Sequence, residues 1–83
     1  MSDEKQNVNG YEITLDRAMN GYRVYVYCTI KGNEGLLDVE EGIQEKWMAH
    51  QVFVAYVTWY GQAMYKRFGT RPTEEWRKEH KDW

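Results

Sequence analysis

The sequence has little of the chemistry that marks secreted, metal-binding or membrane-embedded proteins. Its one cysteine, Cys28, cannot form a disulfide within the chain. With only two histidines, His50 and His80, the chain falls short of the Cys and His ligands that structural zinc sites use. No apolar run is long enough to cross a bilayer, and no charged-then-apolar leader opens the chain. We therefore expect a cytoplasmic protein without a metal, cofactor or membrane partner.

Catalytic and cofactor-binding motifs are missing as well. The glycines are isolated turn residues that match neither the phosphate-loop nor the dinucleotide-binding pattern. His50 falls on an apolar face of a predicted helix and Cys28 on the apolar face of a predicted strand, where a core role is expected for each. A cysteine nucleophile would need a histidine within reach, and no sequence feature brings the two together. We therefore expect a non-enzymatic protein.

What the chain has in excess is aromatic rings, which make up 16% of its 83 residues. The length suits one domain, and so small a domain buries only a modest share of its surface. Aromatic rings compact small cores, and they are also enriched at the centres of protein interfaces. We expect a flexible polar tail at residues 1–10 and a single domain at residues 11–83, with self-association or a protein partner as a supplement to its core.

Two segments alternate between apolar and polar residues, as strands do. Residues 11–16 and 22–31 each place apolar side chains on one face, and Asn20-Gly21 between them is typical of a two-residue type I′ turn. That turn predicts an antiparallel hairpin with Ile13 opposite Cys28. A short third strand at residues 36–39 is an alternative to a simple lead-in to the next element.

A long helix is predicted at residues 39–68. Asp38 and Glu41 match a capping box at its start, and Gly69 matches the left-handed cap beyond its end. The β-branched and aromatic residues 51–60 would also suit a strand, but an apolar seam crosses them without a break at alternating steps of four and three. The residues of the seam, which we expect to face the sheet, are Ile43, Trp47, His50, Val54, Val57, Gly61, Met64 and Phe68.

A second apolar stripe lies roughly opposite the seam on the same helix, and a thin sheet cannot cover both. A short C-terminal helix at residues 72–82 could cover part of it. We expect the remainder to bind a second copy or another protein; the alternative is packing within the chain that leaves a few aromatic residues exposed. The predicted partner-binding residues are Met48, Val52, Tyr56, Trp59, Ala63, Trp76 and Trp83.

Charge is distributed unevenly along the chain. Residues 1–45 carry nine acidic and four basic side chains, whereas residues 46–83 carry four acidic and seven basic ones. Helix-dipole complementarity at the two ends of one long helix explains much of this asymmetry. A second interpretation is an acidic partner surface that imitates nucleic-acid phosphates and steers binding to a basic protein. Its residues would be Glu34, Asp38, Glu40, Glu41 and Glu45.

A single-stranded nucleic-acid platform is the alternative function. Tyr25 and Tyr27, with Arg23 and Lys31 nearby on the polar strand face, could stack bases. The net charge of -2 argues against direct nucleic-acid binding, because phosphate contacts need a basic excess.

Taken together, these patterns predict an α+β fold: an antiparallel hairpin of two or three strands packed on one long helix, followed by a short C-terminal helix. The favoured function is a small protein-binding module, an inhibitor or adaptor that blocks or bridges a partner, with a homodimer as one form. A phage or mobile-element inhibitor of a nucleic-acid-guided defence complex, as anti-CRISPR proteins are, is the most specific hypothesis within that class.

Overall fold

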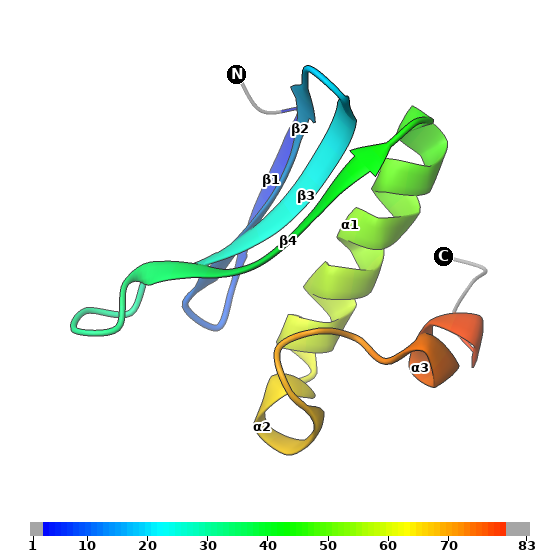
Figure 1. Ribbon diagram of the computed structural model, residues 1–83. Helices are drawn as coiled ribbons and strands as arrows, with labels where there is room; N and C mark the ends of the chain where they lie inside the picture. The colour runs from blue at the N-terminus through cyan, green and yellow to red at the C-terminus, as the bar shows by residue number, and fades with distance from the viewer. Residues whose placement is uncertain (1–2, 80–83) are drawn as a thin grey trace.

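The protein is a four-stranded antiparallel sheet with a helical layer on one face. A computed structural model describes residues 3–79 (Figure 1). Its elements are β1 (Glu4–Val8), β2 (Tyr11–Ala18), β3 (Gly21–Cys28), β4 (Gly35–Ile43), α1 (Lys46–Gly61), α2 (Tyr65–Phe68) and α3 (Glu74–Glu79). The strands lie in chain order across the sheet, and α1 crosses one face of it. This confirms the predicted α+β fold, with four strands in place of two or three.

The first strand corrects the prediction of a polar tail at residues 1–10. Residues 4–8 form β1, which pairs antiparallel with β2 from Glu4 opposite Leu15 to Val8 opposite Tyr11. The connection is Asn9-Gly10, whose φ angles of 51° and 86° are the two positive values that a type I′ turn requires. An edge strand can be polar because only a little of it faces the core, and therefore its composition resembled that of a tail.

The β2–β3 hairpin has a different register from the predicted one. Its loop is Met19-Asn20, closed by Ala18 opposite Gly21, so Ile13 pairs with Val26 and not with Cys28. Gly21 has a φ of 128°, and a Cβ there would lie 2.7 Å from the carbonyl oxygen of Ile43. Glycine is therefore required for both backbone conformation and space. Because strand side chains alternate, this even-numbered shift leaves the apolar residues on the predicted face.

The start of the long helix was predicted too early. Residues 35–43 form β4, the outer strand beside β3, and α1 begins at Lys46 and not at residue 39. Asp38 and Glu40 resemble helix-capping residues in sequence, yet they lie opposite Val26 and Val24 on the sheet face that α1 covers. Polar partners from later in the chain make this strand stable, and a local capping pattern carries no information about them.

The end of the long helix was predicted too late. α1 ends at Gly61, and Ala63 adopts a left-handed conformation with a φ of 56°. The Met64 N–H then donates to the Trp59 carbonyl at 2.9 Å, and the Ala63 N–H donates to the Tyr60 carbonyl at 3.1 Å. These two bonds form a Schellman motif, in which alanine occupies a position that usually belongs to glycine. The chain continues through α2 to α3, which spans residues 74–79 within the described part of the predicted 72–82 helix.

The core lies between α1 and the inner faces of β2 and β3. Ile13, Leu15, Val24 and Val26 have no exposed surface, as expected for the predicted inward face. On α1, the series Ala49, Phe53, Tyr56 and Tyr60 supplies the buried side.

The seam predicted to face the sheet is therefore correct only in part, because Ile43, Val54, Val57 and Met64 pack against the edge of the core and the other members do not. Its members Trp47 and His50 are exposed, with 61% of the Trp47 surface accessible. Because α1 is apolar almost all round, several four-three series run along it, and their spacing alone cannot identify the one that meets the sheet. None of the helices within residues 3–79 combines the length and apolar character needed to span a membrane.

Candidate functional site

The stripe predicted to bind a partner is divided by the structure into a buried part and an open part. Tyr56 and Trp59 are each only 1% exposed. The Trp59 ring meets Trp76 edge-on with centroids 5.3 Å apart, and its Nε1 donates to the Gly69 carbonyl at 2.8 Å. The chain's own C-terminal segment therefore covers this end of the stripe.

The other end of the stripe stays accessible. Met48 is 43% exposed and Val52 is partly buried. Ala63, at the opposite end of the stripe, is a partly buried residue of the turn after α1. Trp83 lies outside the described residues. The candidate binding surface is thus centred on Met48 and Val52, and Trp59 belongs to the core.

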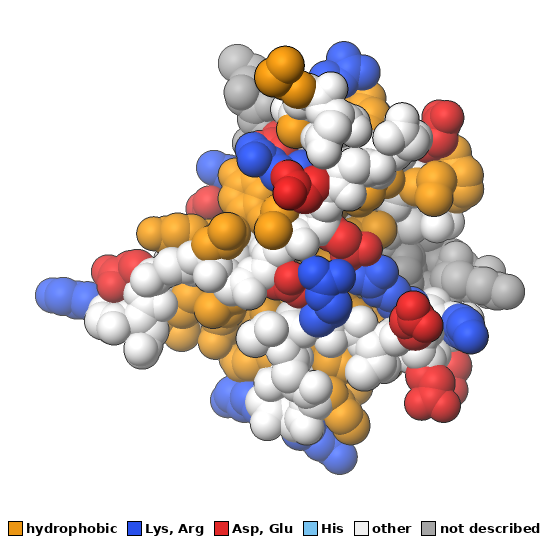
Figure 2. Space-filling view, in the orientation of Figure 1, with side chains coloured by type: hydrophobic (Ala, Val, Ile, Leu, Met, Phe, Trp, Pro, Cys, Tyr) orange, Lys and Arg blue, Asp and Glu red, His pale blue; other side chains and the backbone are white. Residues whose placement is uncertain are grey.

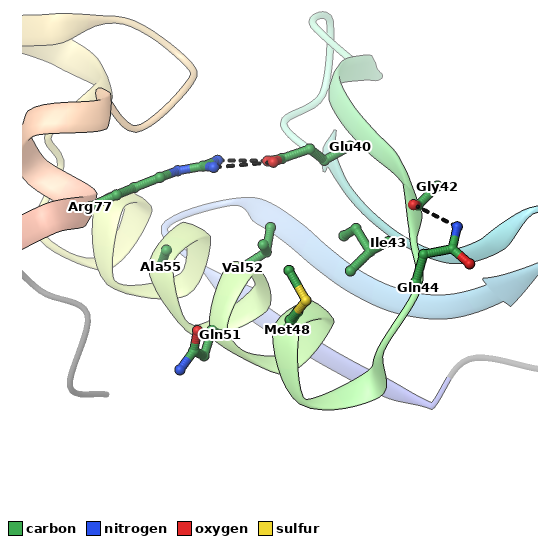
Figure 3. Close-up of a pocket in the computed structure, with 9 residues that line it drawn as sticks. All are labelled: Glu40, Gly42, Ile43, Gln44, Met48, Gln51, Val52, Ala55 and Arg77. Carbon is green, nitrogen blue, oxygen red and sulfur yellow. Dashed lines mark hydrogen bonds and ion pairs between the residues drawn. The ribbon is translucent and has the colours of Figure 1, made fainter.

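This open end forms one wall of a groove of about 500 Å³ between α1, β4 and α3 (Figure 3). The residues that line the groove are Glu40, Gly42, Ile43, Gln44, Met48, Gln51, Val52, Ala55 and Arg77. Figure 3 shows Ile43 from β4 and Met48 from α1 pointing toward each other across it. Apolar side chains make its walls; the Gln44 amide donates to the Gly42 carbonyl at 3.2 Å, and the Gln51 amide points away from the other lining side chains (Figure 3).

An ion pair closes one end of the groove. Arg77 of α3 donates from Nη1 and Nη2 to the two carboxylate oxygens of Glu40 at 3.1 and 2.6 Å. The hydrogen bonds to Glu40 raise the Arg77 pKa, so the guanidinium remains charged. Such a two-point pair fixes the position of α3 against β4. It also leaves the groove without a free charge among its described lining residues.

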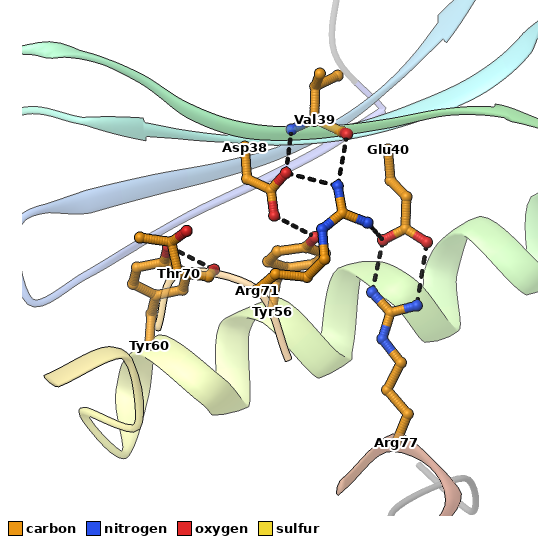
Figure 4. Close-up of polar contacts among 8 residues, drawn as sticks. All are labelled: Asp38, Val39, Glu40, Tyr56, Tyr60, Thr70, Arg71 and Arg77. Carbon is orange, nitrogen blue, oxygen red and sulfur yellow. Dashed lines mark hydrogen bonds and ion pairs between the residues drawn. The ribbon is translucent and has the colours of Figure 1, made fainter. Parts of the chain in front are cut away.

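A second carboxylate of β4 anchors the segment before α3 (Figure 4). Asp38 accepts a hydrogen bond from the Tyr56 hydroxyl at 2.9 Å and one from Arg71 Nη2 at 2.6 Å. Burial, followed by the hydrogen bond to Asp38, raises the pKa of Tyr56 well above its ordinary value. The phenol is therefore a neutral donor near pH 7. The Asp38 contacts hold helix, strand and C-terminal segment together, which is a structural role.

The predicted acidic surface does not form one continuous patch. Arg71 and Arg77 engage Asp38 and Glu40, and in Figure 2 basic and acidic side chains lie together at the centre of the face shown. Glu34, Glu41 and Glu45 are exposed, and Glu34 accepts the N–H of Gly32 at 3.0 Å. The five carboxylates are therefore split between pairs with arginine and separate solvent-exposed positions.

The outer face of the sheet, defined here as the face turned away from α1, holds the predicted stacking residues. Arg23 donates from Nε and Nη2 to Asp16 at 2.9 and 2.8 Å, and its guanidinium carbon lies 5.2 Å from the Tyr25 ring centroid. The hydrogen bond to Asp16 raises the pKa of Arg23. Tyr27 is 39% exposed, next to apolar Leu36 and not to a basic group. The Arg23 guanidinium is thus occupied by the Asp16 carboxylate.

The two residues with nucleophilic or base chemistry lie far apart. His50 is an exposed residue near the start of α1, with Nδ1 2.8 Å from Glu4 Oε2. Cys28 is buried at the end of β3, opposite Tyr11. The Tyr11 ring lies 4.8 Å from that of Tyr60, at the other end of α1 from His50. Neither His50 nor Cys28 lines the groove. Within residues 3–79, no three His, Cys, Asp or Glu side chains gather as metal ligands.

Sequence reasoning missed most of the groove and its anchors. Arg71 and Arg77 were not predicted as site residues, and nothing local indicates that they pair with β4 more than thirty residues earlier. The sequence did contain a detectable signal of an exposed apolar segment at Leu36 and Leu37. Two neighbouring leucines cannot both face the core of a regular strand, and both are exposed here.

The groove suits the binding of an apolar group better than chemistry on a substrate. Its only charged lining residues pair with each other through the two terminal nitrogens of Arg77, whose buried Nε has no hydrogen-bond partner among the described residues, and the other lining residues are apolar, amide or glycine. Apolar walls with a few polar groups at the border are typical of sites that hold an apolar side chain or ligand. Comparisons with protein-family models, with curated proteins and with solved structures found no significant match.

Proposed function

We propose that this chain is a non-enzymatic protein-binding module whose groove receives an apolar side chain from a partner protein. The observation that carries the proposal is an open apolar groove of about 500 Å³ in which both charged residues already pair with each other. Such a groove offers contact area and desolvation, and it offers no free acid, base or nucleophile among its described lining residues. Occupying a partner's surface would make the protein an inhibitor or, with two partners, an adaptor.

The composition of the groove favours a protein partner. Methionine is flexible and polarisable, and it adapts to side chains of different shape at binding surfaces. Met48 at the mouth and Val52 in the wall provide apolar contacts, while the Gln51 amide can donate to and accept from a partner's backbone. Burying one aliphatic or aromatic anchor there would contribute about 1.5–3 kcal/mol before the costs of association.

The nucleic-acid alternative has less support. Arg23, the basic residue nearest Tyr25, is bound to Asp16, and Glu12 on the same face lies 3.8 Å from Lys5. A base-stacking platform needs cationic groups available for phosphates. Arg23 and Lys5 are thus paired with carboxylates, and Lys31 lies in the turn after β3, away from Tyr25, so the proposal is for protein binding.

Two neighbouring residues of α1 allow a matched test. Met48 lines the groove, whereas Trp47 is more exposed and does not line it. Wild-type protein, Met48→Glu and Trp47→Glu would be used for affinity capture from a lysate of the native host, with mass spectrometry to identify bound proteins. The partner found would then be purified and titrated against all three by calorimetry.

The expected result is that Met48→Glu weakens binding at least about tenfold, because a charge enters an apolar contact. Trp47→Glu should bind like the wild type. Both variants add the same charge next to each other at the start of α1, so a general electrostatic effect would appear in both. Equal affinity of Met48→Glu and wild type would overturn the proposal, provided circular dichroism shows both to be folded.

A further inference from the structure

The free edge of β4 is protected in its middle. β4 is an outer strand of the sheet, paired only with β3 among the described elements. At Val39 the N–H donates to Asp38 Oδ1 at 2.9 Å, and the carbonyl accepts from Arg71 Nη2 at 3.1 Å (Figure 4). Both edge-facing backbone groups of Val39 therefore already have partners. Such cover is a known way to prevent an edge from pairing with another strand.

The beginning of the same strand has no such cover, and its pairing with β3 shifts register between Leu36 and Asp38. Residues 35–37 lie where the β3–β4 hairpin extends past the helices, and within residues 3–79 no other element is hydrogen-bonded to their edge (Figure 1). Leu36 is 59% exposed and Leu37 is 39% exposed, next to exposed Tyr27 on β3. Figure 2 shows hydrophobic side chains along this projecting arm. An apolar edge with unpaired backbone groups is a template for strand addition.

We infer that a second copy of this chain pairs antiparallel with this uncovered part of β4, related to the first by a two-fold axis near Leu36. Unpaired backbone groups on a strand edge select a polypeptide strand, and the two apolar side chains require apolar neighbours on it. An antiparallel pair of identical strands is closed and symmetric, so each copy supplies the same surface. The resulting dimer has one continuous sheet.

Charges near the arm are complementary under this symmetry. Leu36 lies midway in sequence between Lys31 and Glu41, which are both exposed and neither of which forms an ion pair with another described residue. Lys31 lies in the turn before β4, so antiparallel pairing about Leu36 directs this turn of each copy toward the Glu41 end of β4 in the other. It also brings exposed Glu34 toward Arg71, whose side chain is 50% exposed. Opposite charges at both ends of the contact favour this register over its parallel counterpart.

A substitution at the proposed axis provides the test. Sedimentation velocity on the full chain over a wide concentration range should show a monomer–dimer equilibrium. Leu36→Lys should raise the dissociation constant at least about tenfold, because a charge on an edge opposes strand addition. Met19→Lys is the matched control: Met19 is fully exposed at the tip of the β2–β3 hairpin, and its variant should dimerise like the wild type. Thermal unfolding would establish that both variants are folded.

Charge reversal tests the register. Lys31→Glu should weaken the dimer, and the double variant Lys31→Glu/Glu41→Lys should restore it, since the complementary pairs are rebuilt with the signs exchanged. A chain that stays monomeric at every concentration would overturn the inference, as would a dimer unaffected by Leu36→Lys. Met48→Glu should leave this dimer intact; loss of the dimer in that variant alone would place the self-contact in the groove instead. The two proposals can thus fail independently.

Discussion

The two ends of the apolar stripe on α1 have the same kind of sequence and different surroundings. Trp59 is enclosed by Trp76 and by the loop carbonyl that its indole N–H contacts, whereas Met48 borders an open groove. The path of the chain after the helix makes the difference, because Trp76 of α3 lies over Trp59 at one end of the stripe, while among residues 3–79 the Met48 end borders the groove (Figure 1). An apolar repeat therefore shows that a surface must be covered, and it does not show by what.

The largest expected difference between the two ends is in stability. Trp59→Ala should lower the free energy of unfolding by about 3–5 kcal/mol, because it removes a buried ring and leaves a cavity beside Trp76. Met48→Ala should change it by less than about 1 kcal/mol, because this side chain is half-exposed. Urea denaturation followed by circular dichroism measures both. Similar losses for the two variants would contradict the division between core and binding surface.

A smaller effect is expected from releasing α3. Arg77→Met should destabilise the protein by about 1–3 kcal/mol, since the partly buried Glu40 carboxylate loses two charge-assisted hydrogen bonds. The comparison is Lys46→Met, which breaks a 3.8 Å pair with Asp3 between largely exposed groups and should cost less than about 0.5 kcal/mol. Equal costs in urea titrations would mean that the anchor of α3 contributes no more than an ordinary surface pair.

The smallest effect concerns pH. The Tyr56 pKa is raised above its ordinary value of 10.0, mainly by burial. Above pH 10 the unfolded state therefore loses a proton that the folded state keeps, so the stability present at lower pH declines as pH rises. Tyr56→Phe should reduce the difference in bound protons between the folded and unfolded states by about one. It should also lower the free energy of unfolding at pH 7 by about 1 kcal/mol, because the hydrogen bond to Asp38 is lost. Urea titrations at pH 9, 10 and 11 measure how the free energy of unfolding changes with pH. The same slope in the wild type and in Tyr56→Phe would show that this phenol is not responsible.

The strands show how far local patterns are sufficient. Two Asn-Gly pairs occur in the chain, and the type I′ turn forms at Asn9-Gly10, while Asn20-Gly21 is shifted by one residue so that glycine follows the loop. The apolar face of β2 and β3 was still predicted correctly, because it depends on alternation and not on register. A side chain at position 21 would meet the Ile43 carbonyl, so glycine is needed beside the second turn because of a residue that is distant in sequence.

The candidate site was harder to predict than the strands. Its walls come from α1, β4 and α3, and a local pattern can identify each of these elements only separately. In addition, the prediction merged β4 with the helix. Asp38 was interpreted as a helix cap and Glu40 as part of an acidic helix start, because their real partners, Arg71 and Arg77, lie after two further helices. The burial of Asp38 and Glu40 is explained by these long-range pairs, so periodicity and capping rules could locate Met48 and Val52 but not the groove between them and β4.

Asn9 has a consequence for how the protein opens. Besides forming the first turn, its Nδ2 donates to the Tyr60 carbonyl at 2.8 Å and lies 3.4 Å from that of Gly61, so the N-terminal hairpin caps the end of α1. Fraying of that hairpin would leave the Tyr60 carbonyl with the Ala63 N–H alone and remove the Asn9 donor from the Gly61 carbonyl, and unwinding of the last helical turn would release the hairpin. The edge strand and the helix end should therefore open as one cooperative unit, with similar amide-exchange protection, although fifty-one residues separate them.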